Sequence, residues 1–138
     1  EIRKLISNKL LASILFYLWI VVIITLTALP KAHVPDLETS SSGGFRLDYP
    51  LHFIFFLIFG GLLYWYGISF RKSKQLGMII FLLIIGIAIA IGDEYIQVLI
   101  PERRFNPKDI YSNVLGTISG YFIGLITIKR IQKINLSS

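Results

Sequence analysis

The sequence contains no cysteine, which excludes disulfide bonds and thiol chemistry. Charged residues are also scarce, at 16% of the chain, and neither an HExxH motif nor a nucleophile motif is present. Most residues of the chain are apolar instead. The hydrophobic fraction of 54% and the mean hydropathy of +0.69 are too high for an ordinary soluble core. The composition therefore predicts an integral membrane protein.

Four apolar runs are long enough to cross a bilayer. They are Leu10–Leu29, Leu51–Ile68, Leu76–Ile91 with a polar extension to Ile100, and Ile110–Ile128. Because a helix rises ~1.5 Å per residue, about 20 residues cover the ~30 Å hydrocarbon layer. We therefore expect an all-α integral membrane bundle of four transmembrane helices, with residues 1–138 forming a single domain. The first run is interpreted as an uncleaved anchor, since it is longer than the usual core of a signal peptide.

The positions of the basic residues predict the orientation of this bundle. Nine of the 14 Lys and Arg residues lie in the N-terminal segment, in the link "SFRKSKQ" and in the C-terminal tail. By the positive-inside rule, both termini and this link are expected in the cytoplasm. The basic residues flank the apolar runs in short clusters, so the net charge of +6 is attributed to topology and no nucleic-acid partner is expected. The expected partner is the lipid bilayer.

The stretch "IGDEYIQVLIPERRFNPKDIYSNVLG", residues 91–116, then faces outward and is unusually rich in charge. Part of it has the pattern of a helix start, because Asn106 can cap a helix and Pro107 is tolerated at its first position. The sequence Asp48-Tyr49-Pro50 has the same pattern of a helix start before the second run, with a proline that is tolerated in the first turn. Asp48 and Asp109 are therefore also explained as helix-start residues.

Helical spacing places small and polar residues on one face of three of the runs. The three stripes are Asp48, His52, Phe56 and Gly60; Gly86, Ala90, Asp93 and Gln97, with Glu94 beside them; and Asp109, Asn113, Gly116, Gly120 and Gly124. The last three glycines form a double small-xxx-small repeat, which lets helix backbones approach closely. Each stripe is polar at its outer end, so packing the stripes together would create a polar pocket under the outer surface.

Asp93 and Glu94 are the residues least well explained by a structural role. Asp93 lies 17 residues beyond Leu76, or ~25 Å along a helix, near the outer hydrocarbon boundary. A carboxylate there needs partners, and we expect Arg103, Arg104 or His52 to supply them. We also expect Asp93 to form hydrogen bonds through Gln97 or Asn113. The candidate ligand-binding residues are Asp48, His52, Asp93, Glu94, Gln97, Arg103, Arg104, Asp109 and Asn113. No catalytic residue or metal ligand is assigned, and the cofactor is left open.

The joint pattern resembles the VanZ-like family of bacterial membrane proteins. The matching residues are Asp48 and His52 ahead of an aromatic run and Gly60, "DEYIQ" at 93–97, Arg103, Phe105, Asp109, Asn113, Gly116 and Gly120. Tyr49 departs from the family, in which a Lys often follows the Asp. The resemblance implies a multi-pass protein of the bacterial cytoplasmic membrane. The founding member of the family is associated with low-level resistance to the glycopeptide teicoplanin.

Three functions are compatible with these residues. The first is a non-enzymatic envelope protein whose outer pocket binds a lipid headgroup, a wall precursor or a glycopeptide, with Arg103 and Arg104 holding an anion. The second is a membrane enzyme that uses His52 with Asp93 or Glu94 as an acid–base pair, with or without a divalent metal. The third is a structural subunit whose polar cluster fixes the helix register within an assembly of membrane proteins. Under the first hypothesis, Asp93 and Arg103 are expected to matter more for activity than for folding.

Overall fold

The computed structural model describes residues 8–29, 48–70, 76–101, 103 and 105–134, except for the side chains of residues 132 and 134. These residues form four helices: α2 (Lys9–Ala28), α3 (Asp48–Ser69), α4 (Leu76–Gln97) and α5 (Pro107–Ile134). Each helix has a segment long and apolar enough to cross a membrane. The prediction of an all-α bundle with four transmembrane helices is thus confirmed.

The helix ends differ from the predicted runs where polar residues continue a helix. α3 begins at Asp48 and α5 begins at Pro107, each three residues before its apolar run. At the start of α5, the side chain of Asn106 accepts a hydrogen bond from the Lys108 amide at 3.2 Å, as expected of a cap. α4 ends at Gln97, and the next residues form turns instead of extending the helix to Ile100. Hydropathy identifies the apolar part of a helix, whereas backbone hydrogen bonding decides its length.

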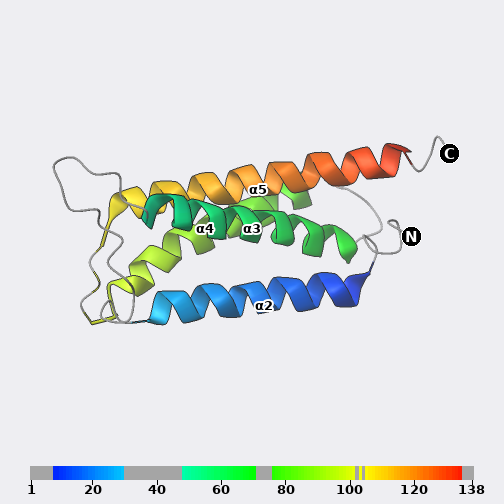
Figure 1. Cartoon of the computed structure of the whole chain (residues 1–138). Coiled ribbons are helices and arrows are strands. Elements are labelled where there is room, and N and C mark those ends of the chain that lie inside the picture. Colours follow the sequence, from blue (N-terminus) through cyan, green and yellow to red (C-terminus); the bar gives the residue numbers. More distant parts are fainter. Residues whose placement is uncertain (1–7, 30–47, 71–75, 102, 104, 135–138) are drawn as a thin grey trace.

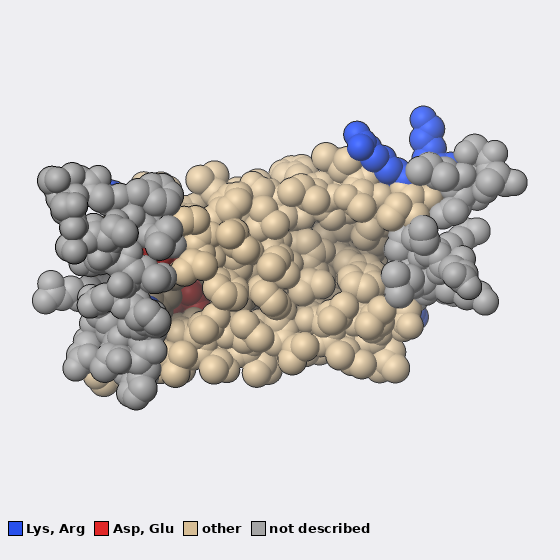
Figure 2. Space-filling model, in the orientation of Figure 1, with Lys and Arg blue, Asp and Glu red and all other residues tan. Residues whose placement is uncertain are grey.

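The four helices run antiparallel to their neighbours in sequence (Figure 1), so the start of α2 and the end of α5 lie at the same end of the bundle. The opposite end, where α2 and α4 finish and α3 and α5 begin, is called the polar end. All the Asp and Glu residues that the structure describes lie there, namely Asp48, Asp93, Glu94 and Asp109. Figure 2 shows acidic side chains in a recess at this end, and Lys and Arg side chains protruding at the other.

The closest helix pair is α3 and α5, which touch through glycine backbones. A Cβ atom added at Gly116 would overlap the carbonyl oxygen of Phe53, and one added at Gly120 would overlap that of Leu57. On the facing helix, a Cβ at Gly60 would overlap the carbonyl oxygen of Thr117. A Cβ at Gly124 would lie 3.3 Å from the oxygen of Gly61, which is also a tight contact. These contacts fix the α3–α5 pair at backbone-to-backbone distance.

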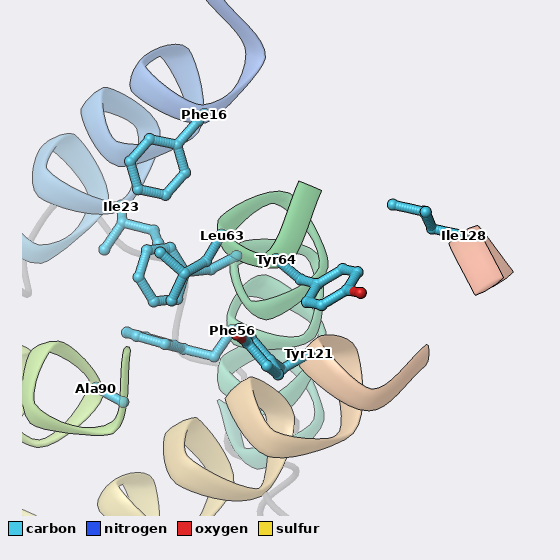
Figure 3. Close-up of a cluster of buried hydrophobic side chains, with 9 residues drawn as sticks. Phe16, Ile23, Phe56, Leu63, Tyr64, Ala90, Tyr121 and Ile128 are labelled. Atoms are coloured by element: carbon cyan, nitrogen blue, oxygen red, sulfur yellow. The ribbon is translucent and has the colours of Figure 1, made fainter. Parts of the chain in front are cut away.

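The other two helices pack against this pair through side chains (Figure 3). α2 contributes Phe16 and Ile23 to the buried cluster, and α4 contributes Ala90. Gly86 of α4 faces side chains, since an added Cβ would meet Leu63 at 2.7 Å and Thr117 at 3.1 Å. A hydrogen bond also joins α2 to α3, since the Trp19 indole donates to the carbonyl oxygen of Phe55 at 3.0 Å. The large apolar side chains on the outer faces, including Ile14, remain exposed, as expected for lipid-facing positions.

Candidate functional site

Buried and half-buried polar side chains from all four helices meet at the polar end. They form two groups, which we call the Asp93 network and the His52 cluster. The Asp93 network comprises Thr27, Asp93, Gln97 and Arg103. The His52 cluster comprises His52, Glu94, Asp109 and Asn113.

The Asp93 network joins α2 to α4. The Thr27 hydroxyl donates to one carboxylate oxygen of Asp93, and the Gln97 amide nitrogen donates to the other at 3.0 Å. Thr27, Asp93 and Gln97 are all buried. Asp93 therefore has a donor on each oxygen, which is how a buried carboxylate avoids the cost of desolvation. Gln97 was expected as a partner, whereas Thr27 is an unpredicted one.

Arg103 reaches this network from the connection between α4 and α5. Its Nη1 donates to the Gln97 side-chain oxygen at 3.4 Å, so Arg103 is linked to Asp93 through Gln97. Its Nε and Nη2 donate to the Leu29 carbonyl at 3.2 Å, and Nη2 also donates to the Leu26 carbonyl at 3.1 Å. These carbonyls end α2, where a cation also stabilises the helix dipole. The guanidinium is thus directed at α2. The other expected cation, Arg104, lies outside the described residues.

The His52 cluster joins α3 to α5 and α4. His52 Nδ1 lies 3.0 Å from the side-chain oxygen of Asn113, and Nε2 lies 4.0 Å from an oxygen of Asp109. Asn113 in turn donates to the backbone carbonyl of Ala90 at 3.3 Å. The side chains of His52 and Asp109 are 20% and 11% exposed, so His52 is the more accessible edge of the cluster. Asp48 occupies the first turn of α3, one turn before His52.

Glu94 differs from its neighbour Asp93 because one of its oxygens has no donor among the described residues. Oε1 accepts a hydrogen bond from the Asn106 amide at 2.7 Å, at the N-terminal end of α5. Oε2 is buried and has no hydrogen-bond partner within the described part of the chain. Glu94 is fully buried, and the side chains of Asp109, His52 and Asp93 lie close enough to interact with it electrostatically. An unsatisfied buried acceptor costs about 1–3 kcal/mol, and such a group in a native structure requires an explanation.

The chemistry available here is hydrogen bonding and proton exchange. Across the described ranges, no three His, Asp or Glu side chains are grouped as metal ligands. Four of the expected residues are brought together, namely His52, Glu94, Asp109 and Asn113. Asp93 instead binds Thr27 and Gln97, and Gln97 also binds Arg103. Sequence reasoning missed Thr27 because a threonine within an apolar run carries no signal of its helix neighbour.

The comparison with protein families agrees with this architecture. The model of the VanZ/LLP1 family matches residues 14–128, which include all four candidate spans except the first turns of α2 and the end of α5. No curated protein and no solved structure matched the chain. Since the family model covers well over half of the sequence, the chain belongs to the VanZ/LLP1 family.

Proposed function

We propose that this VanZ/LLP1 chain is a non-enzymatic protein of the bacterial cytoplasmic membrane that binds a polar component of the cell envelope. The polar end would face outward, and the ligand would bind at the His52 cluster. The candidate ligands are a lipid headgroup, a wall precursor or a glycopeptide such as teicoplanin, with which the founding member of the family is associated. The excess of basic residues at the other end supports this orientation.

The observation that carries the proposal is that Glu94 Oε2 is buried and has no hydrogen-bond partner among the residues that the structure describes. Glu94 lies in the last turn of α4, three residues or ~4.5 Å along the helix axis before the helix ends at Gln97. A ligand at headgroup level that donates a hydrogen bond from a hydroxyl or an amine would satisfy this oxygen. When Glu94 is ionised, the ligand group that meets this oxygen is therefore a donor. Arg103, which was expected to hold an anion, already makes four hydrogen bonds to α2 and Gln97.

The test is protection against teicoplanin in a susceptible bacterial host that expresses the chain. Wild type should raise the minimum inhibitory concentration, and Glu94→Gln should abolish this protection because it removes the carboxylate that receives the donor. Gln retains an oxygen for the Asn106 amide, so the variant should reach the membrane at wild-type levels. Lys129→Gln, an exposed change at the opposite end, is the matched control and should protect like wild type.

One result contradicts the proposed site, and a second narrows the candidate ligands. Full protection by Glu94→Gln at a normal membrane level would exclude Glu94 from the site. No protection by wild type would remove the glycopeptide from the candidate ligands.

A further inference from the structure

His52 and Asn113 face each other beside the backbone contact between α3 and α5. Nδ1 of His52 lies 3.0 Å from the side-chain oxygen of Asn113. Three residues beyond Asn113, a Cβ atom added at Gly116 would overlap the carbonyl oxygen of Phe53, the residue that follows His52. The backbones are therefore in contact next to the two side chains, which places His52 and Asn113 on rigid elements.

The side-chain amide of Asn113 has one acceptable orientation. Its Nδ2 donates to the backbone carbonyl oxygen of Ala90 at 3.3 Å. A carbonyl oxygen only accepts, so turning the amide around would place the Asn113 oxygen against a second acceptor. Asn113 has no exposed surface at which water could satisfy these groups. The Asn113 oxygen is therefore directed at His52.

This orientation decides which nitrogen of His52 carries the proton. Because an amide oxygen only accepts, Nδ1 must be the donor in this hydrogen bond. In a neutral imidazole the other nitrogen, Nε2, is then an acceptor. The neutral histidine side chain in water prefers the opposite arrangement, with its proton on Nε2. The contact with Asn113 thus favours the tautomer that is less common in water.

Nε2 of His52 faces the acidic side of the cluster. It lies 4.0 Å from an oxygen of Asp109, which is longer than a hydrogen bond. Glu94 interacts electrostatically with both His52 and Asp109. The His52 side chain is 20% exposed, whereas Glu94 has no exposed surface, so His52 is the more accessible of the two to a ligand.

We propose that Asn113 is a positioning residue that holds His52 as the Nδ1–H tautomer, and that Nε2 is thereby a second acceptor of the ligand site beside Glu94 Oε2. A ligand that meets two acceptors presents at least two O–H or N–H donors, as glycerol, a sugar or an ammonium group does. The role of Nε2 rests on the proposed function, whereas the tautomer requires no ligand. Measuring the two separately distinguishes failure of the tautomer from failure of the binding proposal.

Nitrogen NMR of the purified full chain in lipid nanodiscs tests the tautomer. The chain has two histidines, so His33→Gln leaves His52 as the remaining one. Protein labelled with ¹⁵N-histidine is measured at an alkaline pH at which histidine is neutral, in nanodiscs of phosphatidylmethanol, whose headgroup has no donor. The Nδ1–H form should outnumber the Nε2–H form roughly tenfold or more, because the Nε2–H form leaves the buried Asn113 oxygen without a donor. A predominant Nε2–H form would overturn the proposal.

Substitutions on α5 separate positioning from a purely structural role. Asn113→Leu removes the acceptor with little change in side-chain volume, so the proton should move to Nε2, as in water. Asn113→Asp keeps an acceptor for Nδ1 and should retain the Nδ1–H form. Ser112→Ala is the matched control, since the Ser112 hydroxyl donates to the Lys108 carbonyl, and it should give the spectrum of the unsubstituted protein. An unchanged spectrum of folded Asn113→Leu would mean that Asn113 does not select the tautomer.

The same spectra in other lipids test the ligand class. Phosphatidylglycerol has hydroxyl donors and phosphatidylethanolamine has an ammonium donor, whereas phosphatidylmethanol has neither. The Nε2 resonance should shift with a donor headgroup, because a hydrogen bond changes the shielding of the nitrogen that accepts it. A shift on adding N-acetylglucosamine to phosphatidylmethanol nanodiscs would instead assign the donor to a wall precursor or a glycopeptide. If the Nδ1–H form is present but no probe moves the Nε2 resonance, Nε2 is not part of the ligand site.

Discussion

Asp93 and Glu94 are adjacent in the sequence, yet their carboxylates have different hydrogen-bonding environments. Both Asp93 oxygens receive donors, from Thr27 and Gln97. In the described part of the chain, Glu94 receives one donor, from Asn106, and its Oε2 has none. This difference assigns Asp93 to holding α2 against α4, and it leaves Glu94 as the candidate for ligand binding. The expectation that Asp93 matters more for activity than for folding is revised accordingly.

Because of this difference, we expect a substitution of Asp93 to lower the stability of the protein much more than a substitution of Glu94. Asp93→Ala leaves the buried donors of Thr27 and Gln97 without an acceptor, so it should lower stability by about 2–4 kcal/mol. Glu94→Gln keeps an acceptor for the Asn106 amide and should change stability by less than about 1 kcal/mol. The melting temperatures of the purified variants in the same detergent check this. Equal loss of stability in both would mean that the two acids have the same structural role.

For a single residue such as Asp93, the sequence predicts that the carboxylate needs hydrogen-bond partners, but it identifies them only in part. The position of Asp93 near the end of an apolar run indicates that its carboxylate must be satisfied, and Gln97, one turn later, was a correct candidate. Thr27 lies 66 residues away, and only the packing of α2 against α4 brings it to Asp93. Arg103 was expected to meet Asp93 directly, but the end of α2 offers its guanidinium two carbonyl groups.

Among the elements, the α3–α5 pair depends on positions that have no side chain. Gly120→Ala should destabilise the protein by about 1–3 kcal/mol, because the added Cβ overlaps the Leu57 carbonyl and the backbones must separate. Gly92→Ala is the matched control on α4, where an added Cβ has nothing within 4 Å. It should be neutral or stabilising by up to ~1 kcal/mol, since Ala is the better helix former.

Melting temperature and the yield of monodisperse protein measure the difference between these two variants. If Gly120→Ala melts at the same temperature as Gly92→Ala, α3 and α5 are not in backbone contact.

The helices themselves could be predicted well because length and hydropathy are enough to identify a membrane span. Their polar ends could not be predicted as well, since α5 continues beyond Ile128 through charged residues up to Ile134. The small-xxx-small spacing indicated that Gly116 and Gly120 lie on a packing face. It did not indicate that the partner helix is α3, because a sequence pattern gives the face of a helix and not its neighbour.

The described residues form an antiparallel bundle with all four of their acids at the polar end and four of their six basic residues, Lys9, Lys129, Arg130 and Lys133, at the other. This asymmetry supports the predicted topology, in which both termini lie in the cytoplasm and the polar end faces outward. The proposed function depends on that orientation, because a site on the cytoplasmic side could not bind an envelope component outside the membrane. The direction in which the polar end faces is therefore the central claim.

Impermeant thiol labelling of intact cells tests this claim most directly, and the absence of cysteine gives a clean background. Single cysteines are placed at Ser42, in the link between α2 and α3, at Ser73, between α3 and α4, and at Ser138. We predict labelling of Ser42→Cys in intact cells, and labelling of Ser73→Cys and Ser138→Cys only after permeabilisation. Labelling of Ser73→Cys but not of Ser42→Cys in intact cells would place the polar end in the cytoplasm and contradict the account.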